Sequence, residues 1–183
     1  GYDAYIVKLN SNGDATWTKA LGRGGYDYAR GIYQTTDGGY IVGCEETSIG
    51  YFVKLDANGD TLWTKRYNLS GVDYNKLTLT DDGGYACTGA TSQGGWDFFA
   101  FKTDNNGDTL WAKRYGGGSV DKGNDIQPTA DGGYIMVGSA MSFGAGGQDV
   151  FLVKTDANGN LEWSKAFGGI INDEGKSVIQ STD

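Results

Sequence analysis

The chain repeats itself with a period of about 49 residues, and this period constrains the fold more than any other feature. Four segments align around a lysine and a tryptophan that stand nine residues apart in every copy. The lysines are Lys8, Lys54, Lys102 and Lys154, so successive copies are separated by 46, 48 and 52 residues. Self-similarity at such a period is typical of repeat architectures, in which each copy is one supersecondary unit.

Further landmarks recur in each copy. An aspartate stands ten residues after each of these tryptophans, and a D-G-G-Y motif follows it in three copies. The aspartates are Asp27, Asp73, Asp121 and Asp173. Most of the length variation falls between the D-G-G-Y aspartate and the next lysine, where the separations are 17, 20 and 23 residues. Insertions confined to one connection per copy predict one variable loop, at the same end of every unit.

Each copy predicts four short strands, separated by turn signals. Asn58-Gly59, Asn106-Gly107 and Asn158-Gly159 lie between the third and fourth strands and predict two-residue hairpin turns, in which both residues take positive φ. In the copies that show them best, the strands are expected at residues 31–35 or 124–128, 40–44 or 134–138, 51–56 or 150–156, and 61–67 or 161–167.

The third strand of each copy decides between the possible architectures. Residues 98–101 and 150–153 are continuous apolar runs, which predict a strand covered on both faces of its sheet. Four-stranded sheets of this kind, repeated every 49 residues, favour a β-propeller. A β-solenoid has coils of roughly 20–30 residues and an immunoglobulin-like array has units of about 100. We therefore predict an all-β chain of four-stranded antiparallel propeller blades.

The strand order predicts about 3.75 blades and fifteen strands. The expected parts are a partial blade at 1–27, blades at 28–73, 74–121 and 122–173, and the first strand of a further blade at 174–183. Two interpretations remain open: a fragment of a larger ring, or a four-bladed ring in which the first hairpin meets residues 177–182. An open arc of blades would expose apolar end faces, which neighbouring chains or domains are expected to cover.

The motifs D-G-G-Y-I-V-x-G, G-G-x-D and V-K-x-D-x-N-G-x-x-x-W-x-K resemble the propeller repeats of secreted and surface proteins of bacteria and archaea. The resemblance covers nearly the whole chain. A more distant similarity connects the fourth-strand hairpin to the tryptophan-docking repeats of quinoprotein-type propellers. The resemblance implies a propeller fold and an extracellular or cell-surface location, and it transfers no catalytic residues.

Composition excludes several functional classes. The chain has no histidine, which removes histidine-based triads and zinc–histidine sites, and its net charge of −8 without a basic cluster argues against a nucleic-acid partner. No run of about 18 apolar residues predicts a membrane-spanning helix. Cys44 and Cys87 are expected to be buried small apolar residues with free thiols, and a disulfide between them is the alternative.

The repeated tryptophans and aspartates have structural interpretations. We expect the fourth-strand tryptophans to pack between blades, with the indole N–H bonded to the next blade, rather than to stack on sugars. The D-x-N-G-D segments at 56–60 and 104–108 resemble a calcium loop only in part, because position 12 is Tyr67 or Tyr115 and not Glu. We expect the side chains of Asp27, Asp73, Asp121 and Asp173 to bond to the backbone, with weak calcium binding as the alternative. No cofactor is expected.

The variable loops supply the candidate binding residues. They leave the same end of every unit, so they are expected to form a composite binding rim on a rigid frame. Trp96 is the one tryptophan outside the repeated positions. The candidate residues are Gln93, Trp96, Asp97, Gln148 and Asp149.

These observations favour a non-catalytic extracellular binding or scaffold module for a protein or glycan ligand. One alternative is a structural component of a surface layer or fibre, in which neighbouring chains cover the end blades. A less favoured alternative is the propeller of a secreted enzyme, either a quinone-dependent oxidoreductase or a glycoside hydrolase. Hydrolysis needs two converging carboxylates, and Glu45-Glu46 is the one carboxylate pair outside the repeat.

Overall fold

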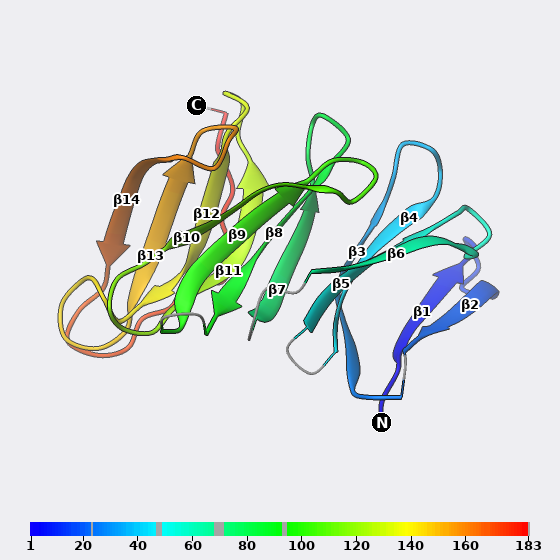
Figure 1. The fold of residues 1–183 in the computed structure, drawn as a ribbon, viewed down its shortest axis with the longest axis horizontal. Helices are drawn as coiled ribbons and strands as arrows, with labels where there is room; N and C mark the ends of the chain where they lie inside the picture. The colour runs from blue at the N-terminus through cyan, green and yellow to red at the C-terminus, as the bar shows by residue number, and fades with distance from the viewer. Residues whose placement is uncertain (23, 47–48, 68–71, 93–94, 183) are drawn as a thin grey trace. The chain divides into compact units, whose positions relative to one another are not determined.

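The computed structural model describes the 183-residue chain except for residues 23, 47–48, 68–71, 93–94 and 183 (Figure 1). The described residues form fourteen strands and no helix, which confirms the all-β prediction. No helix able to cross a membrane occurs in the described part of the chain. The strands are β1 (Ala4–Leu9), β2 (Ala15–Leu21), β3 (Asp27–Gln34), β4 (Tyr40–Glu46), β5 (Ile49–Leu55), β6 (Thr61–Tyr67), β7 (Val72–Leu79), β8 (Tyr85–Thr91), β9 (Asp97–Thr103), β10 (Thr109–Tyr115), β11 (Asp121–Pro128), β12 (Tyr134–Ala140), β13 (Asp149–Thr155) and β14 (Leu161–Phe167).

The strands form blade-like antiparallel sheets in chain order. Strands β3–β6, β7–β10 and β11–β14 each make a four-stranded sheet, and β1 pairs with β2 alone. Within each sheet, strands that are consecutive in the chain therefore lie side by side, as the repeat predicts. The chain divides into two compact units, Gly1–Leu69 and Ser70–Asp183. The first unit holds the β1–β2 and β3–β6 sheets, and the second holds the other two.

The first strand of each sheet begins earlier than predicted. β3 begins at Asp27 and β11 at Asp121, instead of at residues 31 and 124. Each carries a bulge, because the register skips Arg30 in β3 and Asn124 in β11. A bulge breaks the alternation of inward and outward side chains, so the residues before it do not show the pattern of a strand. The equivalent residue of β7, Asn75, is also skipped.

The turns between third and fourth strands contain three residues, not the predicted two. In the β5–β6 turn the amide of Gly59 donates to the carbonyl of Asp56 at 3.2 Å, and the amide of Asp56 donates to the carbonyl of Asp60 at 2.9 Å. Gly59 has φ 86°, a value that glycine adopts at little cost. The side chain of Asp56 accepts the amides of Asn58 and Asp60, and this favours the wider turn.

A repeated tryptophan joins the neighbouring sheets within each unit. In the first unit the indole N–H of Trp17 donates to the carbonyl of Ala57 at 3.1 Å, and its ring meets Tyr40 edge-on at 5.5 Å. In the second unit Trp111 donates to the carbonyl of Ala157 at 3.0 Å and meets Tyr134 at 5.6 Å. The predicted packing role is therefore confirmed for both tryptophans.

Apolar side chains fill the space between the sheets of each unit. In the first unit Ala4 and Ile6 of β1 belong to one cluster with Val42 and Val53 of the next sheet. In the second unit Phe98 of β9 belongs to one cluster with Met136 and Val153. Burial of such faces against each other is the main stabilising contribution to folding.

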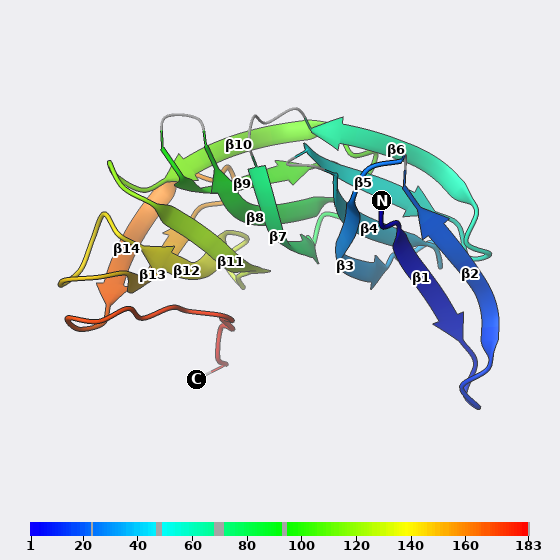
Figure 2. The same ribbon diagram turned by 90° about the horizontal axis from the view of Figure 1, so that it is seen from below.

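Among the described residues, the fifteenth strand predicted at 174–183 is not formed, because no described strand pairs with residues 177–182. The segment still runs alongside the last sheet (Figure 2). The carboxylate of Asp125 accepts the hydroxyl of Ser177 and the amide of Val178, and the side chain of Gln180 accepts the amide of Ala130. Asn124 donates to the carbonyl of Gly175 at 2.8 Å, just as Asn75 donates to that of Gly123. The segment thus accepts the hydrogen bond that a first strand accepts from the preceding sheet, although it forms no strand itself.

Candidate functional site

The two ends of each four-stranded sheet differ in their connections. At one end, here called the turn end, short turns join the first strand to the second and the third to the fourth. At the other end, here called the loop end, the connection of variable length joins the second strand to the third. The β8–β9 loop includes Trp96, and the β12–β13 loop spans residues 141–148. The predicted binding residues that the structure describes, Trp96, Asp97, Gln148 and Asp149, belong to the loop end.

A backbone contact fixes the ends of the β8–β9 and β12–β13 loops, and an equivalent contact precedes β1. The carbonyl of Trp96 accepts the amide of Asp121 at 2.5 Å, and the carbonyl of Gln148 accepts the amide of Asp173 at 2.5 Å. In the first unit the carbonyl of Tyr2 accepts the amide of Asp27 at 2.7 Å. Because the main chain makes this repeated contact, the side chain at the position can change without loss of the frame. The three copies carry Trp, Gln and Tyr there.

Trp96 lies at the loop end of the second unit and is partly exposed. Its side chain is 37 % exposed, and the ammonium group of Lys122 is 5.5 Å from its ring centroid. Met141 and Phe143 of the next loop are 53 % and 42 % exposed. The amide of Met141 donates to the carbonyl of Val120, the residue before the one that bonds to Trp96. We call Trp96 and Lys122 the Trp96 patch.

Asp121 anchors the start of the β12–β13 loop beneath this patch. Its buried carboxylate accepts the hydroxyl of Ser142 at 2.7 Å, the amide of Ser142 at 3.1 Å and the amide of Gly117 at 2.8 Å. Gly117 follows β10 of one sheet and Ser142 follows β12 of the next. The backbone bonds predicted for this aspartate therefore join neighbouring sheets.

The other predicted residues lie at the same end but make separate contacts. Asp97 pairs with Arg114 at 3.6 Å. The side-chain amide of Gln148 donates to Ser139 at 2.6 Å. Asp149 is fully buried and accepts the amide of Ala145 at 2.9 Å. The sites around Trp96 and Gln148 are thus equivalent positions on adjacent sheets, not one pocket. Gln93 lies outside the described residues.

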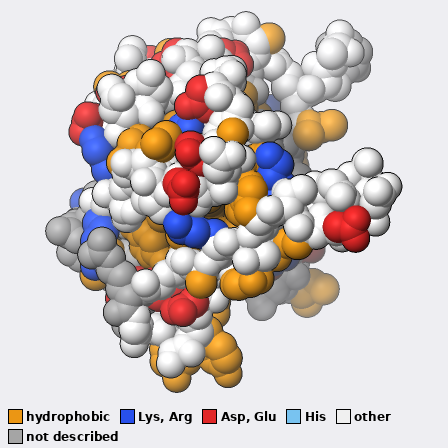
Figure 3. Space-filling view, turned by 90° about the vertical axis from the view of Figure 1, so that its right-hand side faces the viewer, with side chains coloured by type: hydrophobic (Ala, Val, Ile, Leu, Met, Phe, Trp, Pro, Cys, Tyr) orange, Lys and Arg blue, Asp and Glu red, His pale blue; other side chains and the backbone are white. Residues whose placement is uncertain are grey.

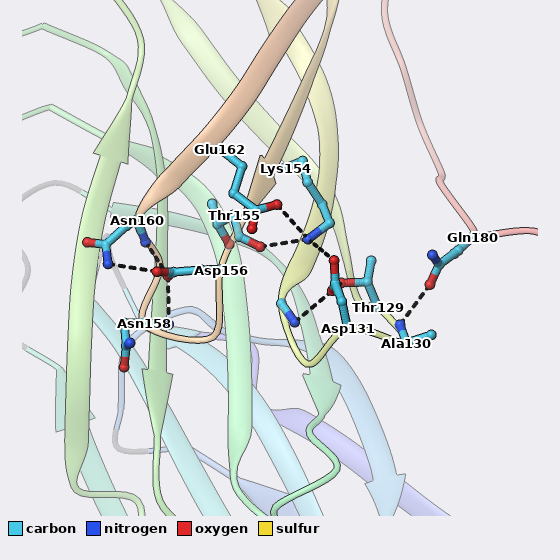
Figure 4. Close-up of polar contacts among 11 residues, drawn as sticks. Thr129, Ala130, Asp131, Lys154, Thr155, Asp156, Asn158, Asn160, Glu162 and Gln180 are labelled. Atoms are coloured by element: carbon cyan, nitrogen blue, oxygen red, sulfur yellow. Dashed lines mark hydrogen bonds and ion pairs between the residues drawn. The ribbon is translucent and has the colours of Figure 1, made fainter.

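A repeated ion pair at the turn end escaped sequence reasoning. Lys54 pairs with Asp37 at 2.8 Å, Lys102 with Asp82 at 2.5 Å and Lys154 with Asp131 at 2.9 Å. Figure 4 shows the last pair, in which Lys154 also contacts Glu162. These lysine side chains are nearly buried while the aspartates remain largely exposed. The three pairs are structural rather than catalytic, because they recur in every four-stranded sheet.

The aspartates of these turns are held in their charged form. Lys54, the hydroxyl of Thr35 and the amide of Gly39 hold the pKa of Asp37 well below its usual range. The same set around Asp131, led by the Thr129 hydroxyl and Lys154, lowers its pKa in the same way. The signal available in the sequence was the recurrence of Lys and D-G-G-Y, but their separation varies because the variable loop lies between them.

The carboxylate pair considered for catalysis is used in ion pairs. Glu45 accepts two hydrogen bonds from Arg30, and Glu46 pairs with Arg66. Adjacent residues of a strand point to opposite faces of the sheet, so the two carboxylates do not converge on one substrate. This geometry does not support a hydrolase built on Glu45 and Glu46.

Both cysteines are free and buried, as expected. Burial raises the pKa of Cys44 to about 12 and that of Cys87 well above its ordinary value. The thiolate is the reactive form, so neither thiol is a nucleophile near neutral pH.

The calcium-like segments behave as turns. Asp56 and Asp104 each direct one carboxylate oxygen at two amides of their own turn. Within the described residues no group of three or more His, Cys, Asp or Glu side chains gathers around one point. The D-x-N-G-D segments thus offer the carboxylates of a turn, not a calcium cage.

A groove of about 540 Å³ lies at the turn end of the second unit. Trp111, Tyr134, Leu110 and Asp81 are among its lining residues. A smaller groove of about 310 Å³ in the first unit is lined by the equivalent Trp17 and Tyr40. The grooves recur with the repeat and result from the packing of the tryptophans. We therefore interpret them as features of the repeated fold and not as ligand-binding sites.

No protein-family model and no curated protein matches this chain.

Proposed function

We propose that the chain is a non-catalytic binding module of a secreted or surface protein, with its sheets arranged as the blades of a β-propeller. Two features support the blades: four-stranded meanders in sequence order, and sheets that bury apolar side chains against the next sheet within each unit. The extracellular location follows from the resemblance of the repeat motifs. In this arrangement the variable loops present the ligand-binding surface.

The observation that carries this proposal is the arrangement around Trp96. Its carbonyl makes the contact that the repeat requires, while its side chain remains 37 % exposed beside Lys122. An exposed aromatic ring with a neighbouring cation suits the apolar face of a sugar or an aromatic or acidic side chain of a protein. Tryptophan is also enriched among the residues that dominate binding energies at protein interfaces.

Glycan and protein arrays probed with the whole chain test this proposal. Trp96→Ala should weaken binding of any ligand found by at least about tenfold, the usual effect of losing a central aromatic contact. Leu62→Ala provides the control, because Leu62 is 57 % exposed on β6, in the other unit. Arrays without any ligand, or equal binding by both variants, would reject the Trp96 patch as the binding surface.

A second candidate function, self-assembly into a layer or fibre, is favoured by the terminal sheets. Tyr5, Val7 and Leu9 of β1 are 63 %, 45 % and 55 % exposed, whereas the equivalent Tyr51, Val53 and Leu55 of β5 are at most 6 % exposed. Figure 3 looks onto the β1–β2 side and shows hydrophobic side chains open to solvent.

The last sheet shows the opposite face. Phe167 of β14 is 52 % exposed, whereas the equivalent Tyr67 and Tyr115 are 7 % and 6 % exposed. The β1–β2 sheet therefore exposes the face that, in the other copies, packs against the preceding sheet. The β11–β14 sheet exposes the face that packs against the following sheet. A head-to-tail contact between copies would cover both.

Light scattering at increasing protein concentration distinguishes this candidate. Self-assembly predicts a mass that rises with concentration in the parent chain and remains at one copy in Val7→Asp. A constant monomer mass in both would exclude it and leave the binding module.

A further inference from the structure

In the last three copies of the repeat, the carboxylates at the loop end have different partners. Asp97 of β9 has Arg114 of β10 as its partner, and the arginine stands three residues after the repeated tryptophan. In β6 the arginine is retained as Arg66, which pairs with Glu46. In the last sheet the aspartate is retained as Asp149, but Ala166 replaces the arginine. Asp149 has therefore lost the cation that its counterpart uses.

A second carboxylate approaches Asp149 in the last sheet. A Cβ atom placed on Gly168 would overlap Oδ1 of Asp149 and would lie 2.7 Å from Oδ2 of Asp173. These two oxygens thus converge on the same small space beside a glycine. At the equivalent Gly116 the three nearest atoms all belong to Asp121, because Asp97 turns to Arg114 instead.

The Asp149 carboxylate is only half satisfied. The residue is 0 % exposed, and its Oδ2 accepts the amide of Ala145, but its Oδ1 has no hydrogen-bond donor. Asp173 accepts the amide of Gly169 at 3.0 Å. Neither carboxylate forms an ion pair within the described part of the chain. A buried carboxylate without a counter-charge is costly, and a second carboxylate nearby increases the cost.

We propose that Asp149 and Asp173 bind a divalent cation of the calcium class between Oδ1 of Asp149 and Oδ2 of Asp173. The cation would supply the positive charge that Arg114 supplies to Asp97. The donors are oxygens only, which suits Ca²⁺ or Mg²⁺ rather than a soft transition metal. Ca²⁺ fits better, because it accepts irregular geometry and the surrounding segment of residues 144–147 is rich in glycine.

The site would fix the long variable loop at its second end. Residues 141–148 are anchored at their start by Asp121 and at their end by Asp149, Asn172 and Asp173. A cation between Asp149 and Asp173 would join the loop end to the segment after β14. The site does not depend on what the Trp96 patch binds, so it stands or falls separately from the proposed binding function.

Calorimetric titration of the EDTA-treated chain with CaCl₂ and, separately, with MgCl₂ tests the proposal, together with the unfolding temperature. At a free Ca²⁺ concentration near 100 times Kd, the Tm of the parent chain should rise by on the order of 5 °C. Asp149→Asn should weaken Ca²⁺ binding by at least about tenfold, because a charged ligand is lost. Asp97→Asn is the matched control and should keep the full response.

Ala166→Arg provides an independent test, because it restores the arginine of the neighbouring sheet. This variant should remain folded in EDTA and should no longer respond to Ca²⁺. A response to Mg²⁺ alone would assign the smaller cation to the same site. No response of the parent chain to either cation, or an equal response in Asp149→Asn, would overturn the proposal. A parent Tm that does not change between EDTA and Ca²⁺ would likewise overturn it.

Discussion

The turn end and the loop end of the sheets obey different rules, although both recur with the same period. At the turn end the side chains themselves recur, as in the pairs of Lys54 with Asp37 and Lys154 with Asp131. At the loop end the recurring contact uses the main chain of Trp96 and Gln148, and the side chains differ. Because the main chain makes the structural contact at the loop end, the side chains there can vary and can serve ligand binding. The turn end therefore belongs to the structural frame, and the loop end is the candidate binding surface.

The largest effect is expected from removing a turn-end tryptophan. Trp111→Ala should lower the free energy of unfolding by about 3 kcal/mol, because the ring packs between two sheets and its N–H bonds to Ala157. Trp111→Phe should cost about 1–2 kcal/mol, since most of the apolar contact is kept. Urea denaturation measures both. A loss below about 1 kcal/mol for Trp111→Ala would contradict the packing role.

The turn glycines separate backbone strain from contact with the next sheet. Gly59 and Gly13 have φ 86° and 87° in equivalent turns, but only at Gly59 would a Cβ press on a tryptophan ring, that of Trp17. Gly13→Ala should cost about 1 kcal/mol for the conformation alone, and Gly59→Ala about 2–3 kcal/mol. Thermal unfolding of the two variants measures the difference. Equal costs would show that the ring moves away freely.

Acid should weaken the turn end through its aspartates. The folded pKa of Asp37 lies below the unfolded value near 4, so its contribution is complete above about pH 5 and is lost as the pH falls through and below 4. Lys54→Met should lower stability at pH 7 by about 1 kcal/mol and should flatten this acid dependence. Unfolding curves between pH 2 and 7 provide the test. A variant with the acid dependence of the parent would place the effect elsewhere.

The smallest effect on stability is expected at the loop end. Trp96→Ala should change the free energy of unfolding by less than about 1 kcal/mol, because its side chain is partly exposed and its main-chain bond to Asp121 remains. The same substitution at Trp111 is the comparison. If Trp96→Ala unfolds the chain as readily as Trp111→Ala, the ring belongs to the frame and not to a binding surface.

The repeat predicted much of the fold, because each copy marks strands and turns independently. The β6, β10 and β14 tryptophan strands and the D-G-G-Y turns follow from spacing alone. The early starts of β3 and β11 did not, because the bulges at Arg30 and Asn124 hide the alternation. Residues 177–182 have the sequence of a first strand but form no strand, because strand formation also requires a partner strand. A local sequence pattern does not show whether that partner is present.

The candidate site was predictable only in its location. Length variation confined to one connection predicted that Trp96 and Asp149 lie at the loop end, and the structure has both there. Asp97 pairs with Arg114 of the next strand, whereas Asp149 has no arginine at that position. Because the partners lie on different strands, this difference becomes visible only in the structure. The lysine–aspartate pairs were hidden for the same reason, since a loop of variable length separates the partners.

Amide hydrogen exchange compares the two ends most directly. Three amides of the D-G-G-Y turns are hydrogen-bonded to an aspartate of their own turn and are therefore expected to be protected from exchange. They are those of Gly39, Gly84 and Gly133. They should exchange on the order of 100-fold more slowly than the amides of residues 143, 144, 146 and 147 in the β12–β13 loop. Similar exchange rates at both ends would contradict the division between a fixed frame and an adaptable binding end.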